Sequence, residues 1–398
     1  MIHFVAPEEG RFGIDDYLAS SWSGSMHERI RQITYPELFG RTSLPRGTWI
    51  FAGLDQLTPS GLKIAGQVWQ NLAAGGQERL LNHPFRVLKR YDLLSTLHRA
   101  GINRFRAIRV HESWNDLRFP VFLREENYHT GSISGVVKNR AELRRELRWA
   151  RFRGFRLSDL LIVEFCDTSG GTGFFRKYSA FKIGEAILAR YLNISRNWMV
   201  KAEQGVADEG SAMEERRYVR ENPHEPWLRR VFKIAQIDYG RMDYGLCGDA
   251  PQVWEINTNP RITASRSPRI RTAEEALFRE QRQPGREHFH ELFARAWKAV
   301  DSGSDGPEIP FYIPPELSAQ WRAEAAVCQS VQRSRLLRVR LAANPLIRAI
   351  RSRLEPSTRR VIQCITPLPA EVRQAAGYTL HKPEKPENLE IPEKPGHP

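Results

Sequence analysis

The alternation of apolar and polar positions divides the first hundred residues into strand and helix signals. Short apolar runs predict strands in HFVAP and GTWIFAGLDQL, and the spacing in PSGLKIAGQVWQNLAAGG predicts a helix that glycines stop. A further helix is predicted in LNHPFRVLKRYDLLSTLHRAGI, again ended by a glycine. Strands that alternate with helices predict the α/β fold class for this part of the chain.

The same pattern continues through the middle of the chain. Between Phe105 and Trp149 it predicts strands, a polar loop EENYHTGSISG and an arginine-rich helix. LSDLLIVEFCD reads as an apolar strand with a polar exit, and FFRKYSAFKIGEAIL as a strand hairpin that turns at Gly184. The segment PWLRRVFKIAQIDY predicts a helix. Mixed strands and helices make the whole molecule α/β (α+β).

A second hairpin carries an unusual set of polar residues. GRMDYGL and QVWEINT read as two short strands joined by the turn CGDAP. Side chains alternate between the faces of a strand. We therefore expect a core face with Met242, Tyr244, Leu246, Trp254 and Ile256. The opposite face then collects Arg241, Asp243, Glu255 and Asn257.

Two carboxylates and an amide oxygen beside an arginine favour a site for a hard cation. Oxygen ligands without sulfur suit Mg²⁺, with Mn²⁺ as an alternative, and Mg²⁺ usually shares the phosphates of a nucleotide. The competing interpretation is an amphipathic hairpin with a solvated polar face. The flanking apolar residues indicate burial, so the metal site is the preferred hypothesis.

Composition and charge add constraints. The chain has 398 residues, 41% of them hydrophobic, which is enough for two or three folded domains. Its 60 basic and 46 acidic residues give a net charge of +14, as in proteins that bind nucleic acid, anionic membranes or anionic small molecules. The four cysteines form no C-x-x-C pair. Neither a signal peptide nor a membrane-spanning run is evident, so we expect a cytoplasmic protein.

The segment DYGRMDYGLCGDAPQVWEINTNP resembles the C-terminal signature of the ATP-grasp superfamily, which includes D-alanine–D-alanine ligase and glutathione synthetase. In that signature an Asp strand precedes a Glu-x-Asn strand. The resemblance implies that Asp243, Glu255 and Asn257 hold Mg²⁺ against the phosphates of ATP. It also implies that Arg241 contacts phosphate or the developing acyl phosphate.

FPVFLREENYHTGSISGVV resembles the basic strand and phosphate-covering flap of the same superfamily. Arg124 stands where the superfamily usually has lysine, so a planar guanidinium with several donors replaces the single ammonium group of lysine. Thr130, Gly131 and Ser132 lie at the tip of the flap, where backbone N–H groups can hold phosphate oxygens. His129 is either a phosphate contact or a surface histidine.

Earlier and later segments supply the remaining nucleotide contacts that the resemblance implies. A basic contact ahead of the flap falls on Lys89 or Arg90, with Arg90 preferred and a solvated helix face as the alternative. LLIVEFCD resembles the strand whose backbone recognises adenine. Its implied residues are Glu164, Phe165 and Cys166, with Asp167 near the ribose.

The hairpin FFRKYSAFKIG offers one more phosphate contact, either Arg176 or Lys177. Alternation places Arg176 with Tyr178 and Lys182 on one face and Lys177 on the other, so only one set can face the nucleotide. We predict Lys177.

The resemblance covers residues 80 to 265 and implies an ATP-grasp fold with an N-terminal α/β domain and a C-terminal helical extension. The predicted divisions are an N-terminal α/β domain (1–104), a flap subdomain (105–165), a large subdomain with the metal site (166–300), a basic helical extension (301–378) and a disordered tail (379–398). Its implied activity is ATP-dependent ligation of a small-molecule or peptide carboxylate to an amine or thiol, through an acyl phosphate. The alternatives are an ATP-binding protein without ligase turnover, kinase-like or regulatory, and a basic binding protein. Arg261 replaces the glycine usual after Asn-Pro, and it either binds a substrate carboxylate or lies on the surface.

The basic C-terminal region leaves a choice of partners open. RSRLLRVRLAANPLIRAIRSRLEP spreads arginines among leucines and isoleucines over a region, Trp321 to Arg360, that is helical in pattern. Such a helix can bind anionic lipid, nucleic acid or an acidic peptide. The preferred interpretation is a helical extension packed on the body with its arginines in solvent. The sequence carries no signal for an oligomeric state.

Overall fold

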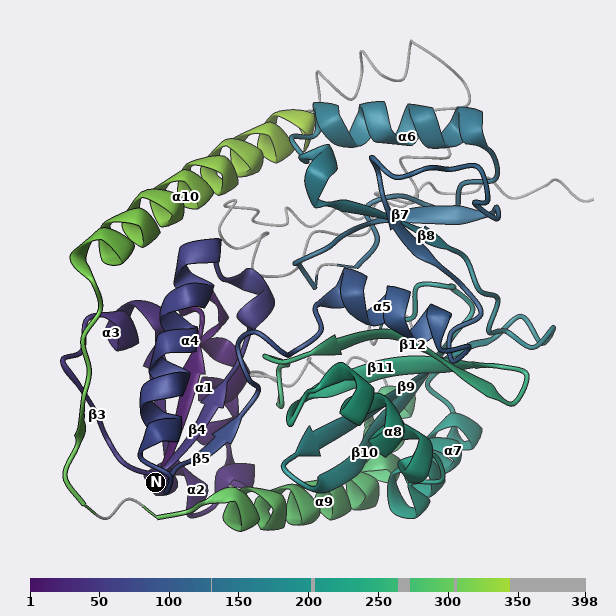
Figure 1. The fold of residues 1–398 in the computed structure, drawn as a ribbon. Coiled ribbons are helices and arrows are strands. Elements are labelled where there is room, and N and C mark those ends of the chain that lie inside the picture. Colours follow the sequence, from purple (N-terminus) through teal and green to yellow (C-terminus); the bar gives the residue numbers. More distant parts are fainter. Residues whose placement is uncertain (130, 202–204, 264–272, 304–305, 344–398) are drawn as a thin grey trace, which may run out of the picture. The chain divides into compact units, whose positions relative to one another are not determined.

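The computed structural model describes residues 1–129, 131–201, 205–263, 273–303 and 306–343. Residues Met1–Val339 form one compact unit, and the strands of the described residues belong to it (Figure 1). Parallel and antiparallel sheets occur together with helices, which confirms the predicted mixed α/β class.

The N-terminal part of the chain forms a four-stranded parallel sheet in the order β2-β1-β4-β5. Its strands are β1 (Ile2–Ala6), β2 (Ile30–Thr34), β4 (Thr48–Phe51) and β5 (Arg79–Leu81). Its connections contain η1 (Glu8–Gly10), α1 (Phe12–Leu18), η2 (Ser21–Ser23), α2 (Met26–Arg29), α3 (Tyr35–Phe39), β3 (Ser43–Leu44), η3 (Leu54–Gln56) and α4 (Pro59–Ala74). β1 is buried along its whole length, as expected for a central parallel strand.

A four-stranded antiparallel sheet follows, in the order β10-β9-β11-β12. It consists of the hairpin β9 (Phe175–Ile183) and β10 (Ala186–Ser195) and the hairpin β11 (Tyr239–Cys247) and β12 (Ala250–Asn257). Both hairpins were predicted, and Gly184 and Gly248 have positive φ at the two turns. Between the hairpins lie α7 (Glu209–Glu221) and α8 (Glu225–Ala235).

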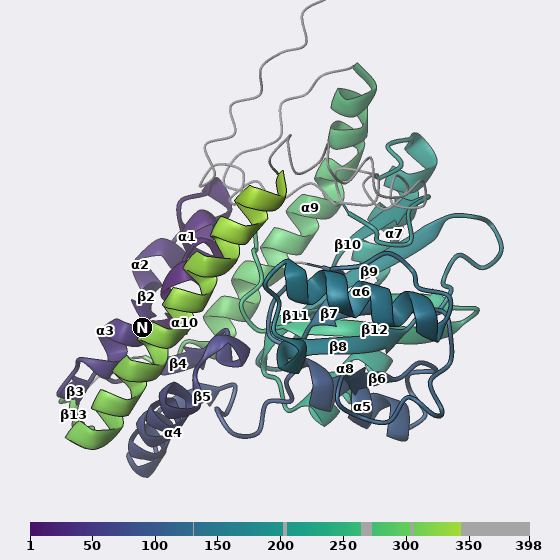
Figure 2. The same cartoon turned by 90° about the horizontal axis from the view of Figure 1, so that it is seen from above.

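A smaller antiparallel sheet, β6-β8-β7, lies over this second sheet (Figures 1 and 2). Its elements are β6 (Ala107–Arg109), β7 (Val121–Glu125), α6 (Arg140–Phe152), η4 (Leu157–Asp159) and β8 (Leu160–Glu164). α5 (Arg90–Arg99) contacts both β12 and β6. Residues 126–137 form the loop after β7 and return to pair with it at Ser132 and Val137.

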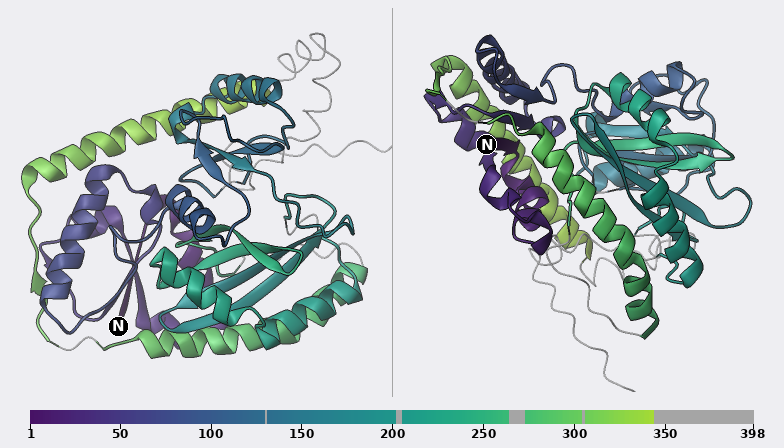
Figure 3. Two further views of the ribbon diagram at one scale, coloured as in Figure 1. Left: turned by 45° about the vertical axis from the view of Figure 1, so that its right-hand side comes forward. Right: turned by 90° about the horizontal axis from the view of Figure 1, so that it is seen from below.

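The long helix α9 (Ala273–Val300) joins the two larger sheets into one core. It passes under the antiparallel sheet and on to the parallel one (Figure 3). Phe289 and Phe293 pack on Phe181 of β9, while Trp297 packs on Phe4 of β1. Aromatic burial of this kind fixes the two sheets against each other.

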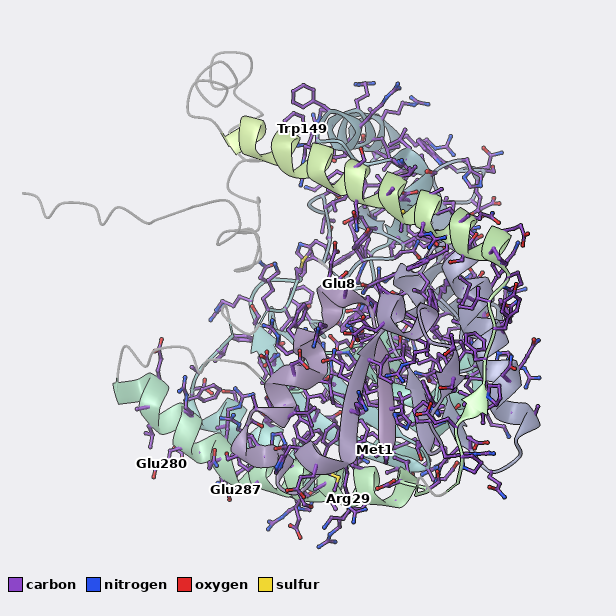
Figure 4. All side chains as sticks on the ribbon, turned by 90° about the vertical axis from the view of Figure 1, so that its left-hand side faces the viewer. Met1, Glu8, Arg29, Trp149, Glu280 and Glu287 are labelled. Atoms are coloured by element: carbon purple, nitrogen blue, oxygen red, sulfur yellow. The ribbon has the colours of Figure 1, made fainter. Side chains whose placement is uncertain are left out.

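Ionic contacts close the end of α9. The N-terminal ammonium of Met1 and the guanidinium of Arg29 both pair with Asp301, at 2.7 and 2.9 Å (Figure 4 labels Met1 and Arg29). β13 (Ile309–Pro310) then pairs with β3, inside the division 301–378 that was predicted to be a helical extension.

The helical extension predicted after residue 321 begins earlier, as α10 (Pro315–Ala343), and residues 344–360 of that prediction lie outside the described residues, as does the tail from 379. Trp321 packs edge-on against Phe39, and Glu324 accepts hydrogen bonds from the backbone and side chain of Ser60. Ser60 lies in the first turn of α4, so Glu324 satisfies donors at a helix N-terminus. No helix of the described residues is long and apolar enough to cross a membrane.

The second hairpin is not a regular ladder. Asp243 pairs with Glu255, but the next residue, Tyr244, pairs with Val253, so Trp254 is an extra residue in β12. Such a bulge turns the side chains that follow it relative to strict alternation.

The predicted position of Trp254 on the core face beside Ile256 is therefore wrong. Val253 takes that place, fully buried, and Trp254 instead packs against the cluster around Phe122 under the smaller sheet. Gly245 makes room for the ring, since a Cβ there would come within 2.2 Å of it. Strict alternation of side chains cannot predict this bulge, because the bulge inserts one residue into β12 and thereby shifts the alternation along the rest of the strand.

Candidate active site

Strand register builds the centre of the candidate site. β11 and β12 place Asp243 opposite Glu255 and Arg241 opposite Asn257, which confirms that these four residues share one face. On the other side of β11, Ser179 of β9 stands opposite Asp243. A row of polar side chains therefore crosses three strands, facing the smaller sheet.

Glu255 is held by cations from outside its own sheet. Its Oε2 accepts hydrogen bonds from Nη2 of Arg90 and Nη2 of Arg124, both at 2.5 Å. Nδ1 of His129 lies 3.0 Å from the same oxygen. α5, β7 and the loop after β7 each contribute one of these residues, so Glu255 is where the smaller sheet meets the larger one.

Arg90 also fixes the backbone of the loop after β7. Its Nη1 donates to the carbonyl oxygens of Glu125, Glu126 and Tyr128, at 2.6 to 3.0 Å. The side chain is only 6% exposed, as is typical of a guanidinium whose donors are used. Lys89, the alternative from sequence, is the N-cap residue of α5 and is less buried.

His129 bridges three parts of the fold. Its Nε2 lies 3.0 Å from Oδ2 of Asp55, which follows β4 of the parallel sheet, while Nδ1 faces Glu255. Burial alone would lower the pKa of His129, but Asp55 and Glu255 outweigh burial and raise it. The histidine is partly buried and is held between two carboxylates, so it is not a free surface side chain.

Asp243 has its own set of partners. Its Oδ1 accepts from Ser179 Oγ at 3.0 Å and Arg241 Nε at 3.2 Å, and Lys177 Nζ lies 3.4 Å from Oδ2. Lys177 thus faces the site as predicted. Arg176 pairs with Glu214 of α7, and Lys182 pairs with Asp238.

These partners keep both carboxylates ionised. Burial would raise the pKa of Glu255, but Arg124, Arg90 and His129 hold it well below its usual value. The pKa of Asp243 is likewise lowered, since Arg241 and Lys177 outweigh its burial. Burial and the neighbouring Arg90 lower the pKa of Arg124 to about 10, so keeping this guanidinium charged in its surroundings costs free energy.

Asn259, two residues after the end of β12, has a structural task. Asn257 Oδ1 accepts from the backbone N–H of Asn259 at 2.7 Å and keeps a second lone pair. Thr258 Oγ1 accepts from the N–H of Gly53, and Asn259 Nδ2 donates to the carbonyl of Gly10. The segment after β12 is therefore anchored to the parallel sheet.

The residue set fits a metal ion that arrives together with a polyanion. Four permanent cations, Arg90, Arg124, Lys177 and Arg241, surround the three carboxylates of Asp55, Asp243 and Glu255. Buried Nε atoms of Arg90 and Arg124 and Oδ1 of Asp55 have no hydrogen-bond partner. Excess cations with unused donors suit phosphate oxygens, and two carboxylates with an amide oxygen suit Mg²⁺.

No group of three or more His, Cys, Asp or Glu residues within the described part of the chain could hold a metal without other ligands. A bare ion would moreover have to displace arginines from Glu255. Phosphates would accept those arginines and release the carboxylate. The metal and the phosphates should therefore bind together.

The residues predicted for adenine lie at the end of β8, next to this centre but with their own contacts. The carboxylate of Glu164 is fully engaged by Arg106 and Arg118, at 2.9 and 2.8 Å. The backbone N–H groups of Glu164 and Phe165 donate to other backbone carbonyls. The Glu164 side chain thus ties β8 to the preceding segment, and the structure does not bring it to Glu255.

Phe165, Cys166 and Asp167 line a neighbouring aromatic region. Phe165 packs edge-on against Trp198, with ring centroids 5.7 Å apart. Burial, with the thiol of Cys247 beside it, raises the pKa of Cys166 to about 12. Asp167 caps its own loop by accepting from Ser169 N. These contacts are compatible with an apolar pocket wall for a base.

The flap tip is described in part, because Thr130 lies outside the described residues. Gly131 has a φ of +92°, and a Cβ there would lie 3.2 Å from the sulfur of Met199. Ser132 Oγ donates to the carbonyls of Leu123 and Ser134. Its hydroxyl therefore holds the shape of the loop.

Arg261 does not point to solvent alone. Its Nε lies 3.5 Å from Asp16 Oδ2, and its guanidinium stacks 4.6 Å above the ring of Phe12. Its carbonyl accepts from Arg241 Nη1 at 3.2 Å. The Arg261 side chain therefore contacts the N-terminal domain at the edge of the site.

Sequence reasoning missed Asp55 and Ser179. Asp55 had one available signal, since it follows the carboxyl end of a parallel strand, where α/β proteins place their sites. Ser179 had none, because only the register of β9 against β11 puts it opposite Asp243.

No protein-family model and no curated protein sequence matches the chain. Solved structures match most of its length. D-alanine–D-alanine ligase from Bacillus anthracis complexed with ATP is 12% identical, with 74% of this chain and 98% of that chain covered and a TM-score of 0.39. The D-alanine–D-alanine ligase from Coxiella burnetii is 12% identical, with 75% of this chain and 96% of that chain covered and a TM-score of 0.41. An ATP-grasp domain protein from Sphaerobacter thermophilus is 13% identical, with 65% of this chain and 90% of that chain covered and a TM-score of 0.34.

The structure is thus similar to solved ATP-grasp proteins.

Proposed function

We propose that this protein is an ATP-dependent carboxylate–amine (or carboxylate–thiol) ligase of the cytoplasm that acts through an acyl phosphate, with Mg-ATP bound between the smaller sheet and the antiparallel sheet. The observation that carries the proposal is the pairing of Glu255 with Arg90 and Arg124 across these two sheets. A buried carboxylate that holds two arginines, each with an unused donor, is suited to exchange them for a phosphate chain and a metal.

Asp243, Glu255 and Asn257 would hold Mg²⁺, because they offer oxygen ligands on two adjacent strands of one face. When bound, Mg²⁺ neutralises charge on the transferring phosphoryl group. Arg90, Arg124 and Lys177 would bind phosphate oxygens as bidentate or point donors. The backbone of the loop that contains Gly131 would cover them and exclude water.

In the first step, an oxygen of the acid substrate attacks the γ-phosphorus of ATP, and the bond from that phosphorus to the bridging oxygen of ADP breaks. In the second, the amine or thiol attacks the acyl carbon, phosphate leaves with the bonding electrons, and the proton released by the amine or thiol passes to the departing phosphate. Arg241 would stabilise the negative charge that develops in both steps. It lies on the same face as Asp243, and Asp243 with Tyr191 raises its pKa despite burial, so it remains a cation.

The test uses the full chain in two stages. Mg-ATP is first tested for thermal stabilisation, which a binder gains as RT ln(1+[L]/Kd). ADP release is then measured across a panel of acids with amines or thiols. The proposal expects stabilisation, release with a suitable pair, and loss of release in Glu255→Gln but not in Asp301→Asn, whose two cation partners lie away from the site.

Stabilisation without release across the panel would replace the proposal by an ATP-binding protein without ligase turnover. Absence of stabilisation by Mg-ATP would overturn nucleotide binding altogether. Salt-sensitive binding to DNA or anionic vesicles by a protein that ignores ATP would favour the third hypothesis, a basic binding protein.

A further inference from the structure

Two partly buried arginines, Arg190 and Arg286, lie beside the candidate site. Arg190 is the extra residue at a bulge in β10, between Ala189 and Tyr191, and a bulge commonly re-aims a side chain. Its guanidinium stacks 4.3 Å from the ring of Phe289 on α9. Arg286 lies one turn before His290 on the same helix. Within the described residues neither arginine makes an ion pair.

Unused polar atoms surround these arginines. His290 is 3% exposed, and neither of its ring nitrogens has a hydrogen-bond partner. Its ring stacks between Trp22, at 4.3 Å, and the more distant Tyr17, whose buried hydroxyl is also without a partner. Thr263 Oγ1 is a third buried atom of this kind. Buried polar groups without partners are rare, and several together point to a ligand.

The local charge is unbalanced. Glu215 of α7 lies near both arginines and offsets part of their excess charge, but its ion pair is with Arg282. The acidic residues Glu280 and Glu287 of α9 are exposed (Figure 4). Burial and the neighbouring Arg286 lower the pKa of Arg190 to about 10. A buried cation without a partner costs stability unless an anion joins it.

This group of residues is continuous with the candidate active site. Arg190 Nη2 donates to the carbonyl of Ile262 at 3.4 Å, and Arg241 Nη1 donates to the carbonyl of Arg261, the preceding residue, at 3.2 Å. Arg241 also lies 5.6 Å over the ring of Tyr191, next to Arg190. The two guanidinium groups therefore border one stretch of backbone.

We propose that Arg190 and Arg286, with His290 and Thr263 beside them, form a subsite for a second anionic group of the acid substrate, either a carboxylate or a phosphate. The subsite rests on the proposed function for its place in the reaction, since the first carboxylate would react near Arg241. The substrate class is then a dianionic acid, a dicarboxylate or a phosphorylated acid. Charge-assisted hydrogen bonds to two desolvated arginines select it over a monocarboxylate.

The subsite is tested first with inorganic phosphate and, in a separate arm, with succinate. The full chain is saturated with Mg-AMPPNP so that the nucleotide position is filled, and its melting temperature is followed. We expect a rise of roughly 2–4 °C at tenfold excess over Kd. The arm with the larger rise identifies the anion: phosphate indicates a phosphorylated acid, succinate a dicarboxylate.

Arg190→Gln and Arg286→Gln should lose this rise, and Arg295→Gln, an exposed arginine of the same helix paired with Glu291, should keep it. Without any anion, Arg190→Gln should melt no lower than the unmodified protein, because it removes a desolvated charge that makes no ion pair within the described residues and that Glu215, already paired with Arg282, offsets only in part. A merely structural arginine would lower the melting temperature when replaced. Equal anion responses in Arg190→Gln and Arg295→Gln, or no response in the unmodified protein, overturn the subsite.

The outcomes separate this inference from the proposed function. If Mg-ATP does not raise the melting temperature of the unmodified protein, that result counts against the nucleotide site. The anion response can still be measured in Arg124→Gln, a variant changed in the nucleotide site and not in the subsite. In the ADP-release screen, dianionic acids should exceed monocarboxylates by roughly 10- to 100-fold in kcat/KM. Arg190→Gln should remove that preference through KM. A preference for monocarboxylates contradicts the subsite even if ligation is found.

Discussion

Glu255 and Arg90 stand 165 residues apart in the chain, and Oε2 of Glu255 lies 2.5 Å from Nη2 of Arg90. The same guanidinium holds the carbonyls of the loop that follows β7. A single side chain thus couples the metal-ligand candidate on the large sheet to the loop that would cover phosphate. Events at Glu255 should be felt in that loop.

Glu255→Gln should destabilise the protein without ligand and abolish ADP release. Removing the charge leaves Arg90 and Arg124 buried without a counter-ion, which costs roughly 3–5 kcal/mol of unfolding free energy. Urea unfolding monitored by fluorescence measures this loss. Unchanged stability would show that the arginines have another partner in solution. Asp301→Asn, which should be destabilised without loss of ADP release, separates the two effects.

Lys177→Met should weaken binding of Mg-ATP by roughly 10- to 100-fold, because it removes one buried cation from the phosphate region. Lys182→Met is the matched control, since Lys182 lies on the same strand, faces the other way and pairs with Asp238. Isothermal titration measures both constants. Equal losses in the two variants would remove Lys177 from the site.

Mg²⁺ alone should give no more than a small thermal shift, whereas Mg-ATP should give a large one. In the absence of phosphate, Glu255 is engaged by Arg90, Arg124 and His129, and Asp243 by Arg241 and Lys177. A bare ion must compete with these cations. Chelation by EDTA should therefore leave the melting temperature of the nucleotide-free protein unchanged. A marked drop on chelation would indicate a resident structural metal instead.

Gly10→Ala should lower the unfolding free energy by roughly 1–3 kcal/mol through overpacking. A Cβ at Gly10 would lie 2.4 Å from Nδ2 of Asn259, inside the contact that anchors the segment after β12. Gly210→Ala, in α7 with no atom nearer than 3.7 Å, should be neutral or slightly stabilising.

The double variant Gly10→Ala/Asn259→Ala tests the contact directly. The two changes should be less than additive, because the second removes the atoms with which the first collides. Strict additivity in urea unfolding would place the strain elsewhere.

Stability should fall as the pH drops below about 6.5, in part because of His290. Burial, with Arg190 and Arg286 nearby, lowers the pKa of His290 to about 3. Between that value and the unfolded value of about 6.5, the unfolded chain binds the extra proton. The stabilisation is therefore complete above pH 6.5 and is lost toward pH 3.

Between pH 7.5 and pH 5 the expected contribution of His290 is roughly 2 kcal/mol. His290→Phe should reduce the fall by that amount, while His3, whose pKa burial lowers to about 4, continues to contribute a fall in the same direction. Chemical unfolding at the two pH values measures both slopes. An unchanged slope in His290→Phe would mean that the ring is charged or solvated in the folded protein.

The sequence by itself determined the hairpin of β11 and β12 and the face that Arg241, Asp243, Glu255 and Asn257 share. Turn residues and period-two alternation are local properties, so they are readable without the fold. The resemblance to the ATP-grasp superfamily also pointed to Lys89 or Arg90, with Arg90 preferred. Alternation along the strand put Arg176 and Lys177 on opposite faces, with Lys177 preferred. The roles of these residues stay predictions.

Only the tertiary structure decided what each of those residues touches. The bulge that moved Trp254 to another cluster, the Asp55–His129–Glu255 bridge and the anchoring of Asn259 at Gly10 all depend on contacts between distant segments. Nothing in the sequence distinguishes Arg190 and Arg286 from the many other basic residues. Their significance comes from partial burial beside the unpartnered ring nitrogens of His290, a property that exists only once β10 and α9 are packed together.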